Sequence, residues 1–232
     1  MATRVYIDGF NLYYRAVKNT PYKWLNLRKM CELILPEYPI GKIKYFTANV
    51  SARKTDPDQP TRQQIYFRAL KTIPDFEIIR GKFISRDRAM PLSKPIFGNG
   101  WLARFARKII LKLGLDDSFL DRHKIVLVIY TEEKGSDVNL ATHLLIDGFG
   151  KEYDTAVVIS NDSDLEAPIK YVRDVLKLPI ILLNPDEKST SKTLARAASS
   201  VRQIRKGVLE ASQFPEKMTD RSGWFHKPET WQ

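Results

Sequence analysis

The sequence predicts an α/β fold in three layers, a mostly parallel sheet with helices on both faces. Short apolar runs alternate with longer segments of helical pattern along the 232 residues. Several runs, such as "KIVLVIY" and "TAVVIS", are apolar without interruption, which is typical of strands covered on both faces of a parallel sheet. The 43% hydrophobic content indicates a packed core, and the length suits one sizeable domain.

The expected elements follow this alternation in chain order. We expect strands at 5–7, 42–50, 76–81 (continued or paired by 82–85), 124–130, 155–160 and 178–184. We expect helices between them at 60–72, 135–148 and 164–176, the first after a Pro-containing start and the second ending at Gly148.

Residues 86–121 interrupt the alternation and are interpreted as an insertion in a domain spanning 1–210. Its Pro- and Gly-rich beginning predicts a loop, and 101–113 has the pattern of an amphipathic helix. The apolar face of that helix carries Trp101, Leu102, Phe105, Ile109 and Leu113. Four basic residues lie largely opposite and are candidate contacts to a nucleic-acid backbone: Arg104, Arg107, Lys108 and Lys112. An ordinary packing helix or a helix on a membrane surface has the same pattern. Residues 211–232 are expected to form an irregular tail, whose aromatic residues pack on the domain or meet a partner.

The charge balance points to a polyanionic partner. Lys plus Arg number 38 and Asp plus Glu number 27, so the net charge is +11. Solubility alone is the alternative explanation. The single cysteine, Cys31, excludes an internal disulfide and a Cys-rich zinc site. With no apolar run of membrane-spanning length and no leader-like start, a cytoplasmic protein is expected.

Acidic residues follow three of the expected strands. They are Asp8, then Asp137 after "TEEKG", then Asp162 and Asp164 in "SNDSD". In open α/β sheets ligands bind beyond the carboxyl ends of the strands, so these side chains are expected in one crevice. Clustered carboxylates repel one another unless a cation is bound, and Mg²⁺ or Mn²⁺ suits oxygen ligands and phosphate substrates. Such an ion polarises a phosphoryl oxygen and acidifies a bound water, which predicts phosphodiester hydrolysis. Helix capping by single Asp residues, and solvation for Glu132 and Glu133, are the alternatives.

Three motifs in this order, "YIDGFN", "EEKGSDVNLATHLL" and "VISNDSDL", resemble the NYN domain family, the DUF88 or LabA-like group of the PIN-like nuclease superfamily. The resemblance extends over roughly residues 3–210. It implies a Rossmann-like, PIN-like α/β/α fold and a Mg²⁺- or Mn²⁺-dependent nuclease, with RNA as the favoured substrate. It also implies a role for each matching residue: the metal positions Asp8, Asp137, Asp162 and Asp164, the supporting Asn11, and Lys134 as a contact to phosphate.

The chain also departs from the family pattern. Asn161 stands where relatives commonly have Gly, His143 where many have a second helix Asp, and Leu165 where Phe is common. The missing carboxylate at His143 weakens the case for a second metal. Two alternatives therefore stay open, a nucleic-acid-binding or scaffold protein with a weak or inactive site, and a DNase with the same site. An aspartyl phosphatase is disfavoured because Ile7 occupies the place of the required second Asp.

Overall fold

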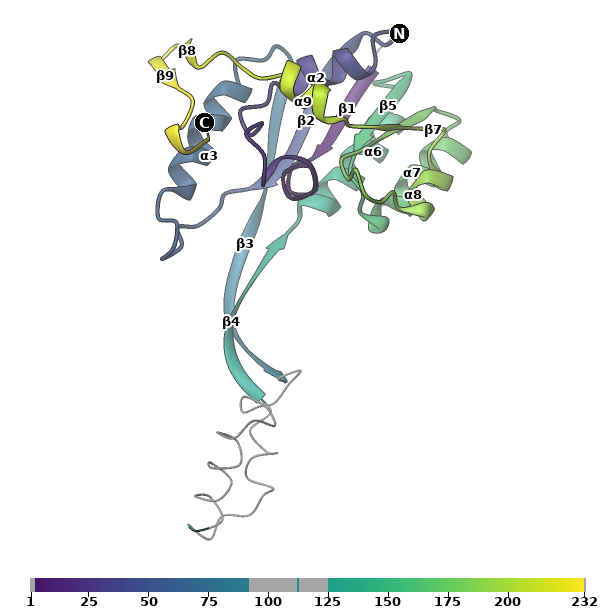
Figure 1. The fold of residues 1–232 in the computed structure, drawn as a ribbon. Coiled ribbons are helices and arrows are strands. Elements are labelled where there is room, and N and C mark those ends of the chain that lie inside the picture. Colours follow the sequence, from purple (N-terminus) through teal and green to yellow (C-terminus); the bar gives the residue numbers. More distant parts are fainter. Residues whose placement is uncertain (1–2, 92–111, 113–124, 232) are drawn as a thin grey trace. The chain divides into compact units, whose positions relative to one another are not determined.

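The computed structural model describes residues 3–91, 112 and 125–231. Its main feature is a seven-stranded sheet with the strand order β4-β3-β2-β1-β5-β6-β7 (Figure 1). The strands are β1 (Thr3–Asp8), β2 (Ile40–Ala48), β3 (Phe76–Pro91), β4 (Ile125–Lys134), β5 (Thr155–Ile159), β6 (Ile180–Asn184) and β7 (Ser200–Gln203). The pairs β1–β2, β1–β5, β2–β3, β5–β6 and β6–β7 are all parallel. The predicted α/β fold with a mostly parallel sheet is therefore confirmed.

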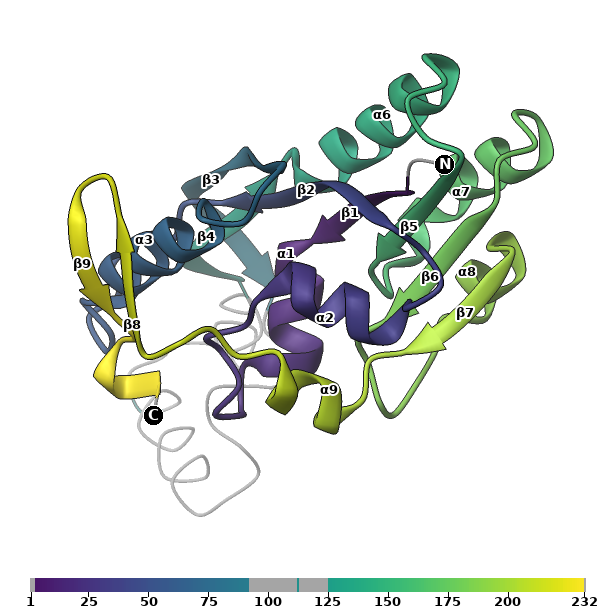
Figure 2. The same cartoon turned by 90° about the horizontal axis from the view of Figure 1, so that it is seen from above.

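Helices connect the strands on both faces of the sheet. The α-helices are α1 (Gly9–Leu12), α2 (Leu27–Ile34), α3 (Gln59–Leu70), α6 (Ser136–Phe149), α7 (Glu166–Asp174), α8 (Lys192–Ala197) and α9 (Lys206–Ala211). Three shorter segments are the π-helix η1 (Tyr13–Val17) and the 3-10 turns η2 (Ser163–Leu165) and η3 (Glu229–Trp231). Figure 2 shows α1, α2 and α9 on one face of the sheet and α6, α7 and α8 on the other.

Alternation along β1 explains the two layers. Val5 and Ile7 point into one core, which they share with residues of α2, α3 and α9. Tyr6, between them, points into the other core with residues of α6, α7 and α8. Because successive side chains of a strand face opposite sides of the sheet, the uninterrupted apolar run of β1 fills both cores.

Contacts along the chain divide it into two units, Phe83–Glu132 and the remainder, Met1–Lys82 with Glu133–Gln232. In the smaller unit the Ser85 and Thr131 hydroxyls are 2.8 Å apart, and the Arg88 guanidinium lies over the ring of Tyr130. β3 continues to Pro91, so the loop predicted to begin at residue 86 is wrong for 86–91. Extended sequence there pairs along the neighbouring strand and overrides the local turn signals.

The strand predicted at 124–130 is likewise longer, and it is not buried on both faces. Leu127 is 78% exposed and Ile129 is 79% exposed. These residues are two apart and share one face of β4. The apolar run led to the expectation of two covering layers, but most of β4 belongs to the smaller unit. Among the described residues, helices pack on the inner strands of the larger unit instead.

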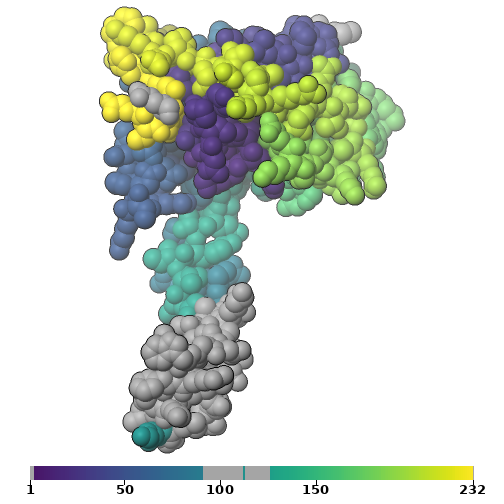
Figure 3. All heavy atoms as spheres, in the orientation of Figure 1, coloured from purple at the N-terminus to yellow at the C-terminus, as the bar shows by residue number. Residues whose placement is uncertain are grey.

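The C-terminal residues are ordered, which corrects the expected irregular tail. β8 (Lys217–Asp220) and β9 (Gly223–His226) form an antiparallel hairpin, with Gly223 at a φ of 103° in its turn. The buried Trp24 contacts the rings of Phe225 and Trp231 edge-on at 6.4 and 6.3 Å between centroids. In Figure 3 these C-terminal residues (yellow) lie beside the first helical segments (purple). Burial of aromatic area against Trp24 therefore fixes the tail.

Most of the predicted basic helix lies outside the described residues. Arg104, Arg107 and Lys108 lie outside the described residues, and Lys112 is described only as an exposed helical residue. Their contact to nucleic acid stays a prediction. Within the described ranges, no helix has both the length and the apolar character needed to cross a membrane.

Candidate functional site

Asp8 ends β1 and is buried, with 4% of its surface exposed. One carboxylate oxygen accepts the backbone N–H of Asn11 at 2.9 Å, which caps α1. The other oxygen accepts the hydroxyl of Ser160, at the end of β5, at 2.9 Å. Burial raises the pKa of Asp8 to about 6 even though both hydrogen bonds oppose the shift, and the charges of Asp137 and Asp162 raise it further. The acid is thus held in place at an electrostatic cost.

Asp137 lies in the first turn of α6. Burial raises its pKa first, and the charges of Asp162, Glu133 and Asp164 raise it further. These charge effects on Asp8 and Asp137 mean that carboxylates from the ends of β1 and β5 and from the start of α6 lie within electrostatic range of one another. The sequence predicted that these elements would bring their acids into one crevice.

Two glycines allow the turn that positions Asp137. Gly135 precedes α6 with a φ of 100°, a conformation that favours glycine. Glu133 then accepts the backbone N–H of Ser136 at 3.1 Å and its hydroxyl at 2.8 Å. A Cβ on Gly81 of β3 would lie 2.3 Å from that Glu133 oxygen. Glu133 is therefore not a freely solvated charge, which corrects one of the alternatives drawn from the sequence.

Asp162 and Asp164 follow β5 directly. The Asp162 side chain accepts the backbone N–H of Asp164 at 3.1 Å and caps η2, so the capping interpretation is confirmed for Asp162 as it is for Asp8. The backbone N–H of Asp162 donates to the Ser160 hydroxyl at 3.1 Å, so Ser160 links Asp162 to Asp8. Over the described residues, no basic side chain forms an ion pair with Asp137, Asp162 or Asp164.

The donor chemistry of this site suits a hard divalent cation, because the charges of these carboxylates repel one another and, within the described ranges, Asp137, Asp162 and Asp164 form no ion pair with a basic side chain. Among residues 3–91, 112 and 125–231, no three His, Cys, Asp or Glu side chains gather closely enough to enclose an ion by themselves. Mg²⁺ commonly keeps several waters and uses one or two carboxylates together with substrate phosphates. The residues fit a cation held in that open manner.

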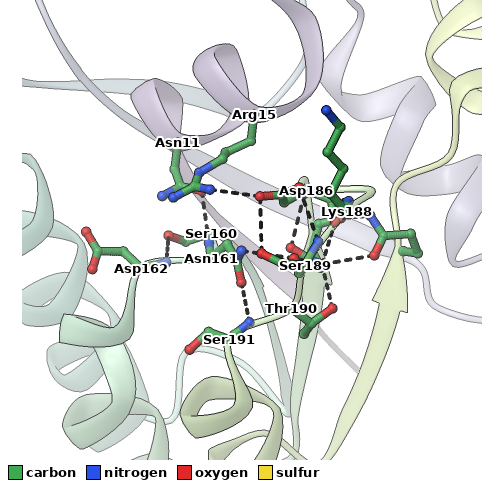
Figure 4. A network of polar contacts seen from close by, with 12 residues as sticks. Asn11, Arg15, Ser160, Asn161, Asp162, Asp186, Lys188, Ser189, Thr190 and Ser191 are labelled. Carbon is green, nitrogen blue, oxygen red and sulfur yellow. Dashed lines mark hydrogen bonds and ion pairs between the residues drawn. The ribbon is translucent and has the colours of Figure 1, made fainter.

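A hydrogen bond joins Asn11 to Asn161, and the sequence did not predict this contact (Figure 4). The Asn11 side-chain oxygen accepts the backbone N–H of Asn161 at 3.0 Å. Asn161 itself donates to the carbonyl of Ser189 at 3.1 Å and accepts the N–H of Ser191 at 2.7 Å. Asn161, which stands where relatives commonly have Gly, therefore fastens the segment after β6 to the end of β5.

Asp186, in the same region, is an acid whose carboxylate has both hydrogen-bond donors and a basic partner (Figure 4). It accepts the backbone N–H of Lys188 at 2.9 Å and pairs with Arg15 at 2.8 Å. These contacts, the Lys188 bond first, hold the pKa of Asp186 below its ordinary value. Nearby, the buried Asn184 donates to the carbonyl of Asp186 at 2.9 Å. The polar run "NPDEKSTS" was the signal in the sequence for this network.

His143 belongs to a different cluster from the carboxylates. It follows Asp137 by six residues on α6, which is about 9 Å along the helix and about 240° around it. Its ring lies 3.1 Å from the ammonium of Lys44, and Lys44 pairs with Asp147 at 2.6 Å. Burial, then the charge of Lys44, lowers the pKa of His143. Lys134 ends β4 with an exposed side chain.

The chain is similar to known proteins in both sequence and fold. A family model described as the NYN domain matches residues 75–205. The matched segment includes Asp137, Asp162 and Asp164, while Asp8 and Asn11 precede it. A curated relative, 6-hydroxy-3-succinoylpyridine 3-monooxygenase from Pseudomonas putida, is 28% identical over 254 residues, covering 100% of this chain and 75% of the relative. A crystal structure of a protein of unknown function from Vibrio parahaemolyticus has a TM-score of 0.51 and 13% identity, covering 88% of this chain and 93% of that one. This last likeness concerns the fold alone.

Proposed function

The chain belongs to the NYN domain family, a family of PIN-like nucleases, and on this premise we propose that it is a divalent-metal-dependent ribonuclease. Nucleases of this kind act on nucleic acid and usually use divalent metals. The observation that carries the proposal is the group of carboxylates from separate elements whose charges raise the pKa of Asp8 and Asp137, with no ion pair to a basic side chain at Asp137, Asp162 or Asp164 in the part of the chain that the structure describes. A cation between them and a phosphodiester substrate would remove that electrostatic cost.

In the proposed reaction Asp8 and Asp137 hold a Mg²⁺ or Mn²⁺ ion, with Asp162 and Asp164 beside them. The bound ion supplies polarisation of the phosphoryl oxygen and acidity to a coordinated water. The hydrogen bonds from the Asn11 N–H and the Ser160 hydroxyl fix the direction of the Asp8 carboxylate. Asn11 also joins α1 to the end of β5 through Asn161, which keeps two of the acidic segments at a constant separation.

Two further features of the chain suit a phosphodiester substrate. Lys134 lies just before the Asp137 turn, and we propose that it contacts the phosphate and its developing negative charge. The net charge of +11 supplies long-range attraction for a polyanion, so binding is expected to weaken steeply with salt.

The direct test compares cleavage and binding in the same preparations. Fluorescent single-stranded and hairpin RNA oligonucleotides, with DNA equivalents, are incubated with Mg²⁺, Mn²⁺ or EDTA. Asp8→Asn and Asp162→Asn should each reduce metal-dependent cleavage more than about 100-fold, beyond the loss typical of a residue that only orients a ligand. Asp174→Asn is the matched control, because Asp174 is a surface acid paired with the adjacent Arg173. Undiminished cleavage in both variants, or no cleavage of any RNA, would refute the proposal.

The same preparations distinguish the alternatives. A nucleic-acid-binding or scaffold protein would bind RNA in EDTA with the usual salt dependence, and no metal would produce turnover. A DNase would cleave the DNA oligonucleotides in preference, with the same dependence on Asp8. In the ribonuclease, binding in EDTA should survive Asp8→Asn, since that acid holds the metal and repels the substrate.

A second candidate activity is oxygenation of a hydroxylated pyridine, favoured by one observation. The relative named as a 6-hydroxy-3-succinoylpyridine monooxygenase matches the whole chain and not only its central segment. Monooxygenation incorporates one atom of O₂ and reduces the other to water, so it consumes a two-electron reductant. The protein would be incubated with that pyridine, O₂ and a reduced nicotinamide. Substrate-dependent nicotinamide oxidation that survives Asp8→Asn would support this activity, and its absence with metal-dependent RNA cleavage present would exclude it.

A further inference from the structure

A cavity of about 110 Å³ lies between α1, η1, β2 and α3. Aromatic side chains from several segments line it, among them Phe10, Tyr13, Tyr45, Tyr66 and Trp231. Pockets that bind small molecules are typically concave and lined mostly by apolar and aromatic side chains, as this one is. The neighbouring cluster around Trp24, in contrast, is packed ring against ring.

The burial of its lining indicates that the cavity opens to solvent. Leu12, Tyr45 and Phe67 form a buried floor, being 3%, 7% and 2% exposed. Phe10 and Tyr13 are only partly buried. A molecule could therefore enter without unfolding the surrounding elements.

The cavity also adjoins the acidic site. Gly9 follows Asp8, and a Cβ on Gly9 would lie only 2.7 Å from the Tyr45 hydroxyl oxygen. Burial, and then the charge of Asp8, raises the pKa of Tyr45 above its ordinary value. The wall of the cavity is thus within electrostatic range of the carboxylate proposed to hold the metal.

One side of the cavity is lined by Arg62 and by Asp56, the acid with which it pairs. Arg62 of α3 contacts Asp56 at 2.6 and 2.5 Å through a single guanidinium nitrogen, Nη2. Its Nε and Nη1 donors have no hydrogen-bond partner within the described residues. Gln63 fixes the adjoining segment, because it donates to the carbonyl of Ala48 and accepts the N–H of Val50, both at 2.9 Å. The arginine and the rings therefore belong to a preformed wall.

We propose that this cavity binds a planar heteroaromatic ring carrying an anionic group, and that in RNA this is an unpaired pyrimidine with its phosphate. Unpaired bases are commonly bound by stacking on aromatic side chains, and guanidinium groups bind phosphate through paired donors. A cavity of about 150 Å³ accommodates benzene, so the space here suits one ring better than a fused purine. The RNA form of the proposal rests on the proposed ribonuclease function, and it assigns single-stranded RNA as the substrate class.

The test measures binding in EDTA, where no cleavage occurs. The probe is an eight-nucleotide single-stranded RNA with one central uridine among otherwise abasic positions, compared with a fully abasic strand of equal charge. Stacking of one base corresponds to about a 5- to 150-fold difference in Kd. The wild-type protein should show that preference, with adenosine in place of uridine binding less tightly.

Two variants locate the preference. Val17→Phe fills the cavity from its floor and should abolish the difference between the uridine and abasic strands. Tyr13→Leu removes a ring from the wall and should reduce the difference, which keeps the test informative if Val17→Phe does not fold. Tyr171→Leu is the control, because Tyr171 is a partly exposed aromatic residue on α7, outside the cavity, and the preference should be retained.

Nicotinate, a free heteroaromatic acid, distinguishes the source of the ring. If nicotinate displaces the uridine strand, ring recognition in the cavity is supported, and if nicotinate alone binds, the ring site stands but its use for RNA is refuted. Equal Kd values for uridine and abasic strands, together with no nicotinate binding, would overturn the inference. If metal-dependent cleavage needs Asp8 but is equally fast with and without the uridine base, the proposed ribonuclease function stands and only this inference is overturned.

Discussion

Asp8→Asn should make the metal-free protein more stable at pH 8. The pKa of Asp8 rises from 3.8 to about 6 in the folded protein, and each unit corresponds to about 1.4 kcal/mol, so the ionised form costs about 3 kcal/mol. The sign follows from proton binding. Between about pH 4 and pH 6 the unfolded chain has lost this proton while the folded chain keeps it. Stability from this group therefore falls as pH rises and levels off above the folded pKa.

Capping alone predicts little change in stability for this substitution. Asp8 caps α1, and a lost cap typically costs about 1 kcal/mol. Asn is an equally good capping residue, so the bond from the Asn11 N–H should survive while the charge is removed. We expect a gain of roughly 2–3 kcal/mol at pH 8 and little change at pH 4. Urea unfolding in EDTA across this pH range measures both, and Asn26→Ala, which removes the cap of α2, should lose stability independently of pH.

Addition of metal should offset this difference in stability. A ligand at 100 times its Kd stabilises the folded state by about 2.7 kcal/mol, and only the wild-type protein retains the Asp8 carboxylate to bind it. Mg²⁺ or Mn²⁺ should therefore raise the stability of the wild type more than that of Asp8→Asn. If the variant is less stable than the wild type in EDTA at pH 8, or if the difference does not change with pH, the interpretation of Asp8 as a costly buried charge is wrong.

Three further substitutions test the surroundings of the site by urea unfolding. Lys44→Met leaves the buried Asp147 with Arg4 at 3.1 Å as its remaining cation and should cost about 1–3 kcal/mol, reduced when Asp147→Leu is added. Asn161→Ala removes two hydrogen bonds to the segment after β6 and should cost about 1–3 kcal/mol, with faster proteolysis of that segment. Gly135→Ala forces a side chain onto a φ of 100° and should cost about 1–2 kcal/mol. Gly207→Ala, in a helix with open space around it, should instead be neutral or stabilising.

The sequence allowed the layered sheet to be predicted because its strands are locally apolar runs. A parallel strand buried on both faces needs no information beyond its own residues, as β1 and β5 illustrate. The position of Asp8 and Asp162 at the ends of the neighbouring strands β1 and β5 then followed from topology, since carboxyl ends of parallel strands meet at one edge. Their role as metal ligands stays a prediction.

Features that depend on distant residues were not predictable. The C-terminal hairpin forms because Phe225 and Trp231 find Trp24, some two hundred residues earlier in the chain. The bonds of Asn161 depend on Ser189 and Ser191, which are near it only after β5 and β6 pair. Pro91 and the Pro and Gly residues after it gave a local loop signal, yet β3, which neighbours β4 in the sheet, extends to Pro91. In each case the deciding contact is far away in sequence.

The contrast between Asp186 and Asp8 indicates why the acidic site requires a function. Asp186 has a guanidinium and backbone donors, so its ionised form contributes to folding and its pKa falls. Asp8 accepts two hydrogen bonds, yet burial and the charge of Asp137 still raise its pKa, so its ionised form is disfavoured in the folded protein. A buried charge that lowers the stability of the metal-free protein has no structural role that Asn could not fill equally well at the cap of α1. The carboxylate there is explained if the folded protein meets a cation that the unfolded chain does not bind, which is the linkage that the metal-dependent unfolding measurement detects.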